Sequence, residues 1–206
     1  MSIYSIYGHN FDCDITLNFA LKTDSSTEAF TIRQSHLNFD HKKIGKTISE
    51  YFKEGVGCFR IQHGQKIEYT CIGSPEEFEK TLLYLAIPIL FYQRNFLVLH
   101  ASCLLLNDKV ILFSGKKGSG KSSLTNSLLR KHNLISEDRC ILEVKNKMKD
   151  VYVYSSQINL IKLNPQIERN KSLINSKLNI DKDYLGRECY LLNTNVHSPN
   201  VKNKID

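Results

Sequence analysis

The sequence predicts an α/β protein in which a small β-rich N-terminal region precedes an α/β core. Short β-prone runs with turn residues between them fill roughly the first 70 residues. A strongly signalled helix begins after Ser74. A glycine-rich loop then lies between an apolar β-prone run and an apolar-periodic helix, an order typical of α/β folds. The expected regions are 1–72 and 73–206.

The first region is expected to consist mainly of strands. Apolar positions alternate in "YSIYG", "DITLNFAL" and "FTIRQ", and His63-Gly64 forms a hairpin signal between two further runs. A short helix, from about Lys43 to Lys53, is expected to interrupt these strands.

The second region opens with a linking helix over residues 74–94. Ser74 is the expected N-cap, Pro75 suits the first helical position, and Glu77 completes a Ser-x-x-Glu capping box. Pro88 should kink this helix, because proline has no N–H to donate and its ring crowds the preceding turn.

The elements around the glycine-rich loop are expected to follow in a fixed order. Two β-prone runs flank Asn107-Asp108 and predict a hairpin that ends in a buried strand, Val110 to Phe113. A helix from about Lys121 to Lys131 and a strand within residues 133–144 come next.

The remaining tail is rich in Lys, Asn and Ile. Strand-like runs at 151–163 and 187–193 are joined by a polar stretch with helical potential. The last ~12 residues are expected to be frayed.

Composition and charge exclude several classes of protein. The longest apolar run, Leu82 to Tyr92, is too short to span a bilayer, and the N-terminus lacks the features of a signal peptide. Six cysteines without Cys-x-x-Cys spacing indicate neither a zinc site nor a disulfide framework. We therefore expect a cytoplasmic protein with no membrane partner.

The positive charge is concentrated in the second half of the chain. Residues 1–99 carry 10 Lys/Arg and 11 Asp/Glu, whereas residues 100–206 carry 18 and 10. The lysines are spread among asparagines without interleaved aromatic residues, so no nucleic-acid partner is expected. A phosphate-binding site explains part of the excess.

Residues 115–122, "GKKGSGKS", match the phosphate-loop pattern G-x-x-x-x-G-K-[ST] at every fixed position. The glycines allow backbone N–H groups to crowd around phosphate oxygens, and the following helix directs its positive end at the same anion. Lys121 is expected to bind the β- and γ-phosphates, and Ser122 to bind Mg²⁺. The expected nucleotide-binding residues are Gly115, Lys116, Lys117, Gly118, Ser119, Gly120, Lys121, Ser122 and Ser123.

The loop therefore predicts a nucleoside triphosphate ligand. ATP rather than GTP is an assumption, because no run in the sequence reads the base and the guanine-reading Asn-Lys-x-Asp pattern is absent.

An acidic pair, Glu137 and Asp138, follows the loop by about one helix and one turn. Consecutive strand residues point to opposite faces, so only one acid would face a metal unless the strand ends there. The alternative interpretation is a solvated strand end. His100 lies between apolar strands, where a histidine on its own is more often a core residue than a catalyst.

The stretch "LHASCLLLNDKVILFSGKKGSGKSSLTNSLLRKHNLISEDRCILEV" resembles the HPr kinase/phosphorylase superfamily. It looks closest to HPr-kinase-like relatives encoded with ribosomally made peptides, including kinases of lasso-peptide precursors. The resemblance is specific from about His100 to Val144, and weaker over residues 4–19 and 73–95.

That resemblance implies a P-loop kinase core akin to phosphoenolpyruvate carboxykinase, with a mixed sheet and flanking helices. It implies an ATP- and Mg²⁺-dependent serine kinase whose substrate is a peptide or small protein. Carried onto this chain, Glu137 would be the base, Asp138 a metal ligand with Ser122, and Lys121 and His100 would line the catalytic site.

Three departures from the family pattern matter. Glu137 stands where the relatives usually have Asp, and Ser123 stands where HPr kinases often have Glu. The chain also ends earlier than the relatives do, so we expect a core truncated at its C-terminus. Arg139 and Arg187 are the arginines best placed to supply transition-state charge.

Three functions follow from these patterns. The first is a peptide or protein kinase. The second is a nucleotide-gated module that binds a peptide or partner without transfer, and the third is a small-molecule kinase. The short C-terminus leaves open a homo-oligomer, a completing partner, or a protein that has lost its activity.

Overall fold

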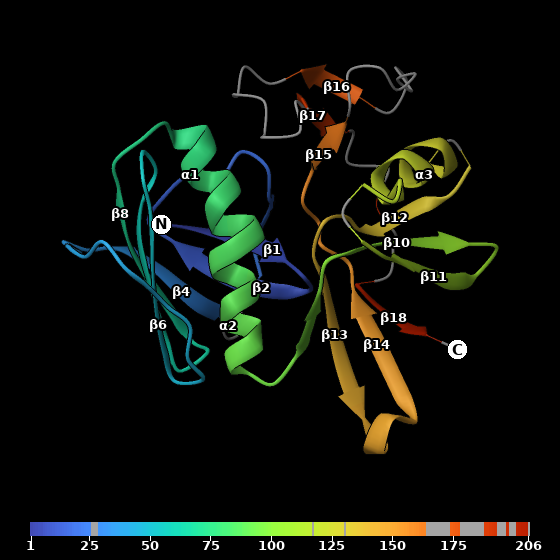
Figure 1. The fold of residues 1–206 in the computed structure, drawn as a ribbon, viewed down its shortest axis with the longest axis horizontal. Coiled ribbons are helices and arrows are strands. Elements are labelled where there is room, and N and C mark those ends of the chain that lie inside the picture. The colour runs from blue at the N-terminus through green and yellow to red at the C-terminus, as the bar shows by residue number, and fades with distance from the viewer. Residues whose placement is uncertain are drawn as a thin grey trace. The chain divides into compact units, whose positions relative to one another are not determined.

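The computed structural model describes residues 1–25, 29–116, 118–129, 131–163, 174–177, 188–192, 197 and 201–205. The chain forms two compact units, residues 1–98 (unit 1) and residues 99–206 (unit 2) (Figure 1). The architecture is mixed α/β with many more strands than helices. The division differs from the expected boundary after residue 72, because the helical segment over 75–93 belongs to the first unit.

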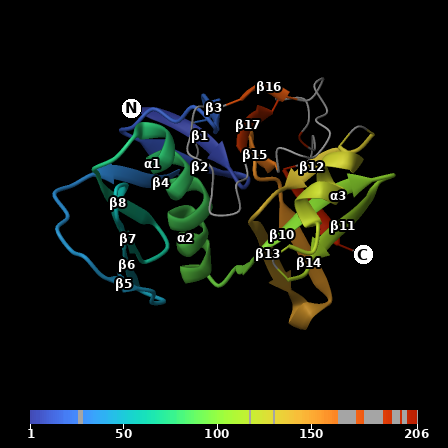
Figure 2. The same ribbon diagram turned by 45° about the horizontal axis from the view of Figure 1, so that its top comes forward.

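Unit 1 contains an eight-stranded sheet in the order β3-β1-β2-β4-β8-β7-β6-β5 (Figures 1 and 2). The three central strands β2, β4 and β8 are parallel, and the neighbours on both sides are antiparallel. The strands are β1 (Ser2–Ile6), β2 (His9–Cys13), β3 (Leu21–Thr23), β4 (Ala29–Gln34), β5 (Lys42–Lys43), β6 (Ile48–Lys53), β7 (Gly57–Gln62) and β8 (Lys66–Cys71).

Two predictions for unit 1, a hairpin turn and a short helix, have opposite outcomes. The turn at His63-Gly64 is confirmed, with both residues at positive φ between β7 and β8. The short helix expected from Lys43 to Lys53 is wrong, because this segment forms β5 and β6. Strand β6 pairs with β7 along its whole length, and this non-local pairing outweighs the local helical preference.

The predicted N-cap at Ser74 and the proline at the first helical position are confirmed for the helical segment of unit 1. Ser74 accepts a hydrogen bond from the Glu77 N–H at 3.3 Å. The Glu77 carboxylate pairs with Lys80 and Lys53. The segment comprises α1 (Pro75–Thr81), the π-helical turn η1 (Leu82–Ala86) and α2 (Ile87–Gln93).

Pro88 is the second residue of α2, which follows the π-helical turn. A proline inside a helix leaves one carbonyl without its N–H partner and crowds that carbonyl with its ring. A widened π-type turn is a common way for a helix to accommodate such a fault and continue. The helix therefore continues past the proline to Gln93.

Two buried polar side chains anchor this helix to other segments of unit 1. Glu79, on α1, accepts hydrogen bonds from the Phe19 N–H at 2.6 Å and the Asn18 amide at 3.3 Å. Gln93 accepts from the Gly64 N–H at 2.8 Å. Its amide nitrogen lies 3.2 Å from three oxygen acceptors, Gly45 O, Ser49 Oγ and Ile61 O.

The described part of unit 2 contains three small sheets and one helix, α3 (Lys121–Leu128). The sheet orders are β11-β10-β12, β18-β14-β13-β9 and β15-β17-β16. The strands are β9 (Leu97–Leu99), which spans the boundary between the units, β10 (Ala101–Leu106), β11 (Lys109–Ser114), β12 (Asn133–Ser136), β13 (Cys140–Lys145), β14 (Asp150–Tyr154), β15 (Leu160–Leu163), β16 (Ile174–Lys177), β17 (Glu188–Leu192) and β18 (Lys202–Ile205). A short 3₁₀ turn, η2 (Asn146–Met148), joins β13 to β14.

The predicted β10–β11 hairpin is confirmed. Asn107 and Asp108 both have positive φ, as a tight two-residue hairpin turn requires. The expectation that its second strand is buried is wrong, since the middle of β11 is only partly buried. Its place at the edge of its sheet explains the difference, because an edge strand has a neighbour on one side only.

The tail also differs from its prediction. The expected fraying of the last residues is wrong for residues 202–205, because β18 pairs antiparallel with β14. Lys202 on β18 forms an ion pair with Glu143 on β13 and lies over the rings of Tyr152 and Tyr154. Residues 174–177 of the expected helical stretch form a strand, and most of that stretch lies outside the described residues.

No helix in the described part of the chain has both the length and the apolar character needed to cross a membrane.

We predict that Glu79→Gln will make unit 1 less sensitive to pH. Burial raises the pKa of Glu79 despite its hydrogen bonds from residues 18 and 19. In the unfolded chain the Glu79 carboxyl loses its proton near pH 4.5, whereas in the folded chain it keeps the proton to higher pH. The free energy of unfolding therefore falls as the pH rises from 4.5 through the higher pKa of the folded state. Urea unfolding from pH 4 to 8 should show a flatter profile for Glu79→Gln.

The control is Glu79→Ala, which removes the acceptor as well as the charge. It leaves the Phe19 N–H buried without its partner, so it should be about 1–3 kcal/mol less stable than Glu79→Gln at every pH. Equal destabilisation by Gln and Ala would contradict this account.

We also predict that unit 2 loses stability in acid through Glu143. Burial raises the pKa of this carboxyl, but hydrogen bonds from Lys202, Tyr154 and Lys145 outweigh burial and lower it to about 2. In the unfolded chain this carboxyl has a pKa near 4.5. Its contribution to the free energy of unfolding is therefore present above pH 4.5 and is lost as the pH falls toward 2. Lys202→Met should shift the acid unfolding midpoint upward, followed by circular dichroism, whereas Lys149→Met should leave it unchanged.

Candidate active site

The glycine-rich loop connects β11 to α3 and has the backbone conformation that its glycines permit. Gly118 and Gly120 have φ values of 81° and 84°, in the left-handed region that other residues rarely adopt. A Cβ on Gly115 would lie 3.0 Å from the Ser119 hydroxyl, which is tighter than most such contacts. Lys117, which the sequence assigned to nucleotide binding, lies outside the described residues.

The start of α3 is open to an anion. Gly120 is its N-cap, and no side chain caps the first turn. The first N–H groups of a helix have no partner within the helix, and they carry the positive end of its dipole. The strand, loop and helix therefore present the local arrangement that binds phosphate in P-loops.

Lys121 bends back over the loop. Its Nζ donates to the Gly115 carbonyl at 2.9 Å and to the Lys116 carbonyl at 3.2 Å. The ammonium group is thus held beside the loop, where phosphate oxygens are expected. In this structure, the two backbone carbonyl oxygens accept its hydrogen bonds.

The acidic pair lies in the connection between β12 and β13, beyond the end of the strand at Ser136. The Arg139 N–H donates to the Glu137 carbonyl at 2.8 Å, and Asp138 between them has a φ of 66°. A hydrogen bond across three residues with a positive central φ defines the rare, strained form of the γ-turn. This turn removes the strand alternation that would send the two acids to opposite faces.

Glu137 connects this turn to the glycine-rich loop. The Ser122 hydroxyl donates to Glu137 Oε1 at 3.0 Å, and the Glu137 side chain is buried. A carboxylate on a neighbouring strand end beside the loop hydroxyl is the arrangement that organises Mg²⁺ in P-loop proteins.

Asp138 faces a different set of groups. His100 Nδ1 lies 3.0 Å from Asp138 Oδ1 and 3.1 Å from the Asp138 carbonyl. Arg139 Nη1 lies 2.7 Å from the same ring nitrogen and 3.0 Å from the same carbonyl.

The contacts at His100 Nδ1 require different tautomers of the imidazole ring. A protonated Nδ1 donates to Asp138, whereas an unprotonated Nδ1 accepts from Arg139. The hydrogen bonds of this cluster therefore depend on whether Nδ1 or Nε2 of His100 carries the hydrogen.

The structure brings most of the predicted site residues together in two connected groups. Lys121, Ser122 and Glu137 meet at the loop, and His100, Asp138 and Arg139 meet at the turn. Ser123 is exposed on the first turn of α3. Arg187 lies outside the described residues.

Sequence reasoning missed Ser136. Its buried hydroxyl donates to the Arg139 carbonyl at 2.5 Å. This hydrogen bond links the residue before the acidic turn to the last residue of the turn. A serine directly before two acids is a weak turn signal, since serine hydroxyls often bond nearby backbone groups.

Among the described residues, no group of three or more His, Cys, Asp or Glu side chains could hold a metal ion. Ser122 and Glu137 offer two oxygens, which fit a Mg²⁺ ion that takes its other ligands from nucleotide phosphates and water. The donor set is thus compatible with Mg²⁺ that arrives with a nucleotide.

No protein-family model, curated protein or solved structure matches this chain.

We predict that Mg-ATP will stabilise unit 2 and that Lys121→Met will abolish this effect. Lys121 lies over the loop and would exchange its carbonyl acceptors for phosphate oxygens. At a nucleotide concentration about 100 times Kd, binding should add roughly 2.7 kcal/mol to stability. Thermal unfolding with and without Mg-ATP measures the shift.

The matched control is Lys109→Met, at an exposed position on β11 away from the loop. It should keep the full shift. An equal loss in both variants would show that net charge, rather than the loop lysine, governs the response.

Proposed function

We propose that this chain is an ATP-dependent kinase that transfers the γ-phosphoryl group to a Ser or Thr hydroxyl of a peptide or small protein. A precursor of a ribosomally made peptide is the preferred substrate class, following the family resemblance of residues 100–144. The observation that carries the proposal is the hydrogen bond between Ser122 and Glu137, which joins the phosphate loop to the acidic turn.

Nucleotide binding is assigned to the loop and the first turn of α3. The left-handed glycines and the uncapped helix start suit the β- and γ-phosphates, and Lys121 supplies a point charge. Bound Mg²⁺ supplies charge neutralisation of the phosphates, and Ser122 and Glu137 are the residues that would hold it.

The family resemblance implies that Glu137 is the base and Asp138 the metal ligand. The contacts favour the opposite assignment of these two roles. Glu137 contacts Ser122, and on this contact we assign it to the metal side of the site. Asp138 contacts His100 and Arg139, and we assign it as the base. With this assignment, Glu137 replaces an Asp of the relatives at the metal ligand and not at the base. The extra methylene therefore does not displace the base, whose position matters most for proton transfer.

The transfer step follows from these roles. The acceptor hydroxyl oxygen forms a bond to the γ-phosphorus while the bond from that phosphorus to the β–γ bridging oxygen breaks. Asp138 accepts the hydroxyl proton, and ADP leaves with the bridging oxygen. Lys121 and Arg139 offset the charge on the phosphoryl oxygens, as electrostatic catalysis of phosphoryl transfer requires.

We predict that the whole chain, incubated with Mg-ATP and the peptide precursor encoded beside its gene, adds one phosphoryl group to the peptide. Mass spectrometry of the peptide measures the gain. Asp138→Asn should abolish transfer and keep nucleotide binding, because asparagine tolerates positive φ and removes only the charge. Glu137→Gln should lower both transfer and the Mg²⁺ dependence of binding.

Asp150→Asn is the control, because Asp150 forms a surface ion pair with Lys204 away from the site. It should transfer at the wild-type rate. Loop-dependent ATP binding without transfer to any hydroxyl would overturn the kinase proposal in favour of a nucleotide-gated binding module.

A further inference from the structure

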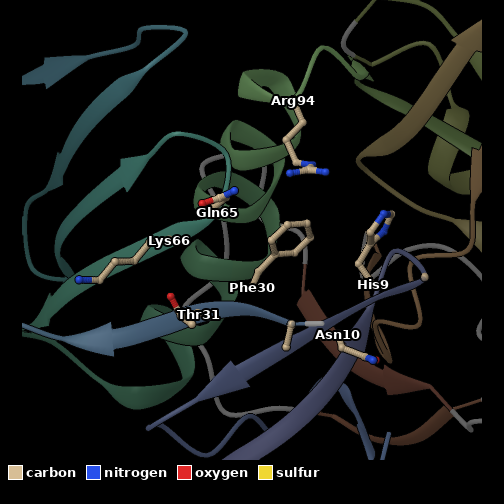
Figure 3. Close-up of a pocket in the computed structure, with 9 residues that line it drawn as sticks. His9, Asn10, Phe30, Thr31, Gln65, Lys66 and Arg94 are labelled. Atoms are coloured by element: carbon tan, nitrogen blue, oxygen red, sulfur yellow. The ribbon is translucent and has the colours of Figure 1, made fainter. Parts of the chain in front are cut away.

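Unit 1 contains a cavity of about 520 Å³ that the phosphate chemistry of unit 2 does not use (Figure 3). Its volume lies in the range of small-molecule sites. It lies at the N-terminal ends of the parallel strands β2, β4 and β8, which begin with His9, Ala29 and Lys66, and beside Arg94 at the end of α2.

The floor of the cavity is aromatic. The ring of Phe30 stacks with the ring of His9, with centroids 5.7 Å apart and planes 28° apart. The rings of Phe11 and Phe91 pack against Phe30, at centroid distances of 5.1 and 6.1 Å. The Nδ1 of His9 donates to the Tyr7 carbonyl at 2.7 Å, which fixes the orientation of that ring. A flat group entering the cavity would therefore meet an ordered aromatic surface.

The rim of the cavity carries a guanidinium group. The Cζ of Arg94 lies 5.1 Å from the centroid of the Phe30 ring. Figure 3 shows the Arg94 guanidinium and the rings of His9 and Phe30 turned toward one another. Gly64 makes room for this side chain, because a Cβ there would lie 2.5 Å from Arg94 Cγ.

Arg94 differs from the other two arginines of unit 1. Arg33 forms an ion pair with Asp12, and Arg60 forms one with Glu50 at 2.8 Å. Within the described residues, Arg94 has no carboxylate partner, and none of the residues that line its cavity is acidic. The other cationic chain of the lining, Lys66, is paired with Glu68 at 2.7 Å.

We propose that this cavity binds a small organic anion, a carboxylate carried on a flat apolar ring. Arg94 takes the carboxylate through its planar, forked N–H groups, as arginine does in bidentate pairs. Phe30 and His9 take the ring. The Thr31 hydroxyl and the Gln65 amide lie in the same lining and supply further polar contacts. This site is independent of the nucleotide chemistry proposed for unit 2.

The test is an NMR titration of the whole chain with ring-labelled phenylalanine. The probes are benzoate, its uncharged analogue benzamide, and acetate, which has the charge without the ring. Benzoate should give saturable shifts of the Phe30 ring and bind more tightly than either of the others. Arg94→Gln should weaken benzoate about tenfold or more, the loss expected when a charged hydrogen-bonding partner is removed.

Arg60→Gln is the matched control, because Arg60 also lies near an aromatic ring, that of Phe39, but pairs with Glu50. The Arg60→Gln variant should leave benzoate affinity unchanged. Arg94→Lys should have a benzoate affinity between those of the wild type and Arg94→Gln, because lysine keeps the charge but lacks the paired N–H groups of the guanidinium. Three results would each overturn the proposal: no saturable shift at Phe30, equal binding of benzamide and benzoate, or unchanged binding in Arg94→Gln.

Discussion

The candidate site depends on the strained three-residue turn at Glu137, Asp138 and Arg139. In a continuing strand the two carboxylates would face opposite sides of the sheet. The hydrogen bond from the Arg139 N–H to the Glu137 carbonyl, with Asp138 at positive φ, instead directs one carboxylate to Ser122 and the other to His100. Backbone strain of this kind costs of order 1–3 kcal/mol and is commonly found where function requires it.

Local signals in the sequence account for the parts of the fold that were predicted correctly. The Ser74 cap, the turn at Asn107-Asp108 and the glycine-rich loop each depend on residues that are neighbours along the chain. Their conformations follow from a side chain that bonds nearby backbone or from a backbone that tolerates positive φ. Such features can be read from a few residues at a time.

The errors arise where distant segments decide the structure. Strand β6 is extended because β7 pairs with it, and β18 is ordered because it pairs with β14 and brings Lys202 to Glu143. No local pattern contains these pairings. The same reason explains why the sequence could name Glu137 and Asp138 but could not assign them to different partners. The cavity beside Arg94 was not predicted either, because its lining comes from four separate elements.

The position of Lys121 has a consequence for the entropy of nucleotide binding. A flexible lysine normally loses rotamer freedom when it captures a phosphate, at about 0.5–1.5 kcal/mol for each side chain that is immobilised. Here the ammonium already bonds to the carbonyls of Gly115 and Lys116, so much of that ordering precedes the ligand. In the proposed nucleotide complex, phosphate oxygens would replace these carbonyl oxygens around an ammonium group that is already held in place. The binding free energy would then depend chiefly on how much better phosphate oxygens satisfy the ammonium than carbonyl oxygens do.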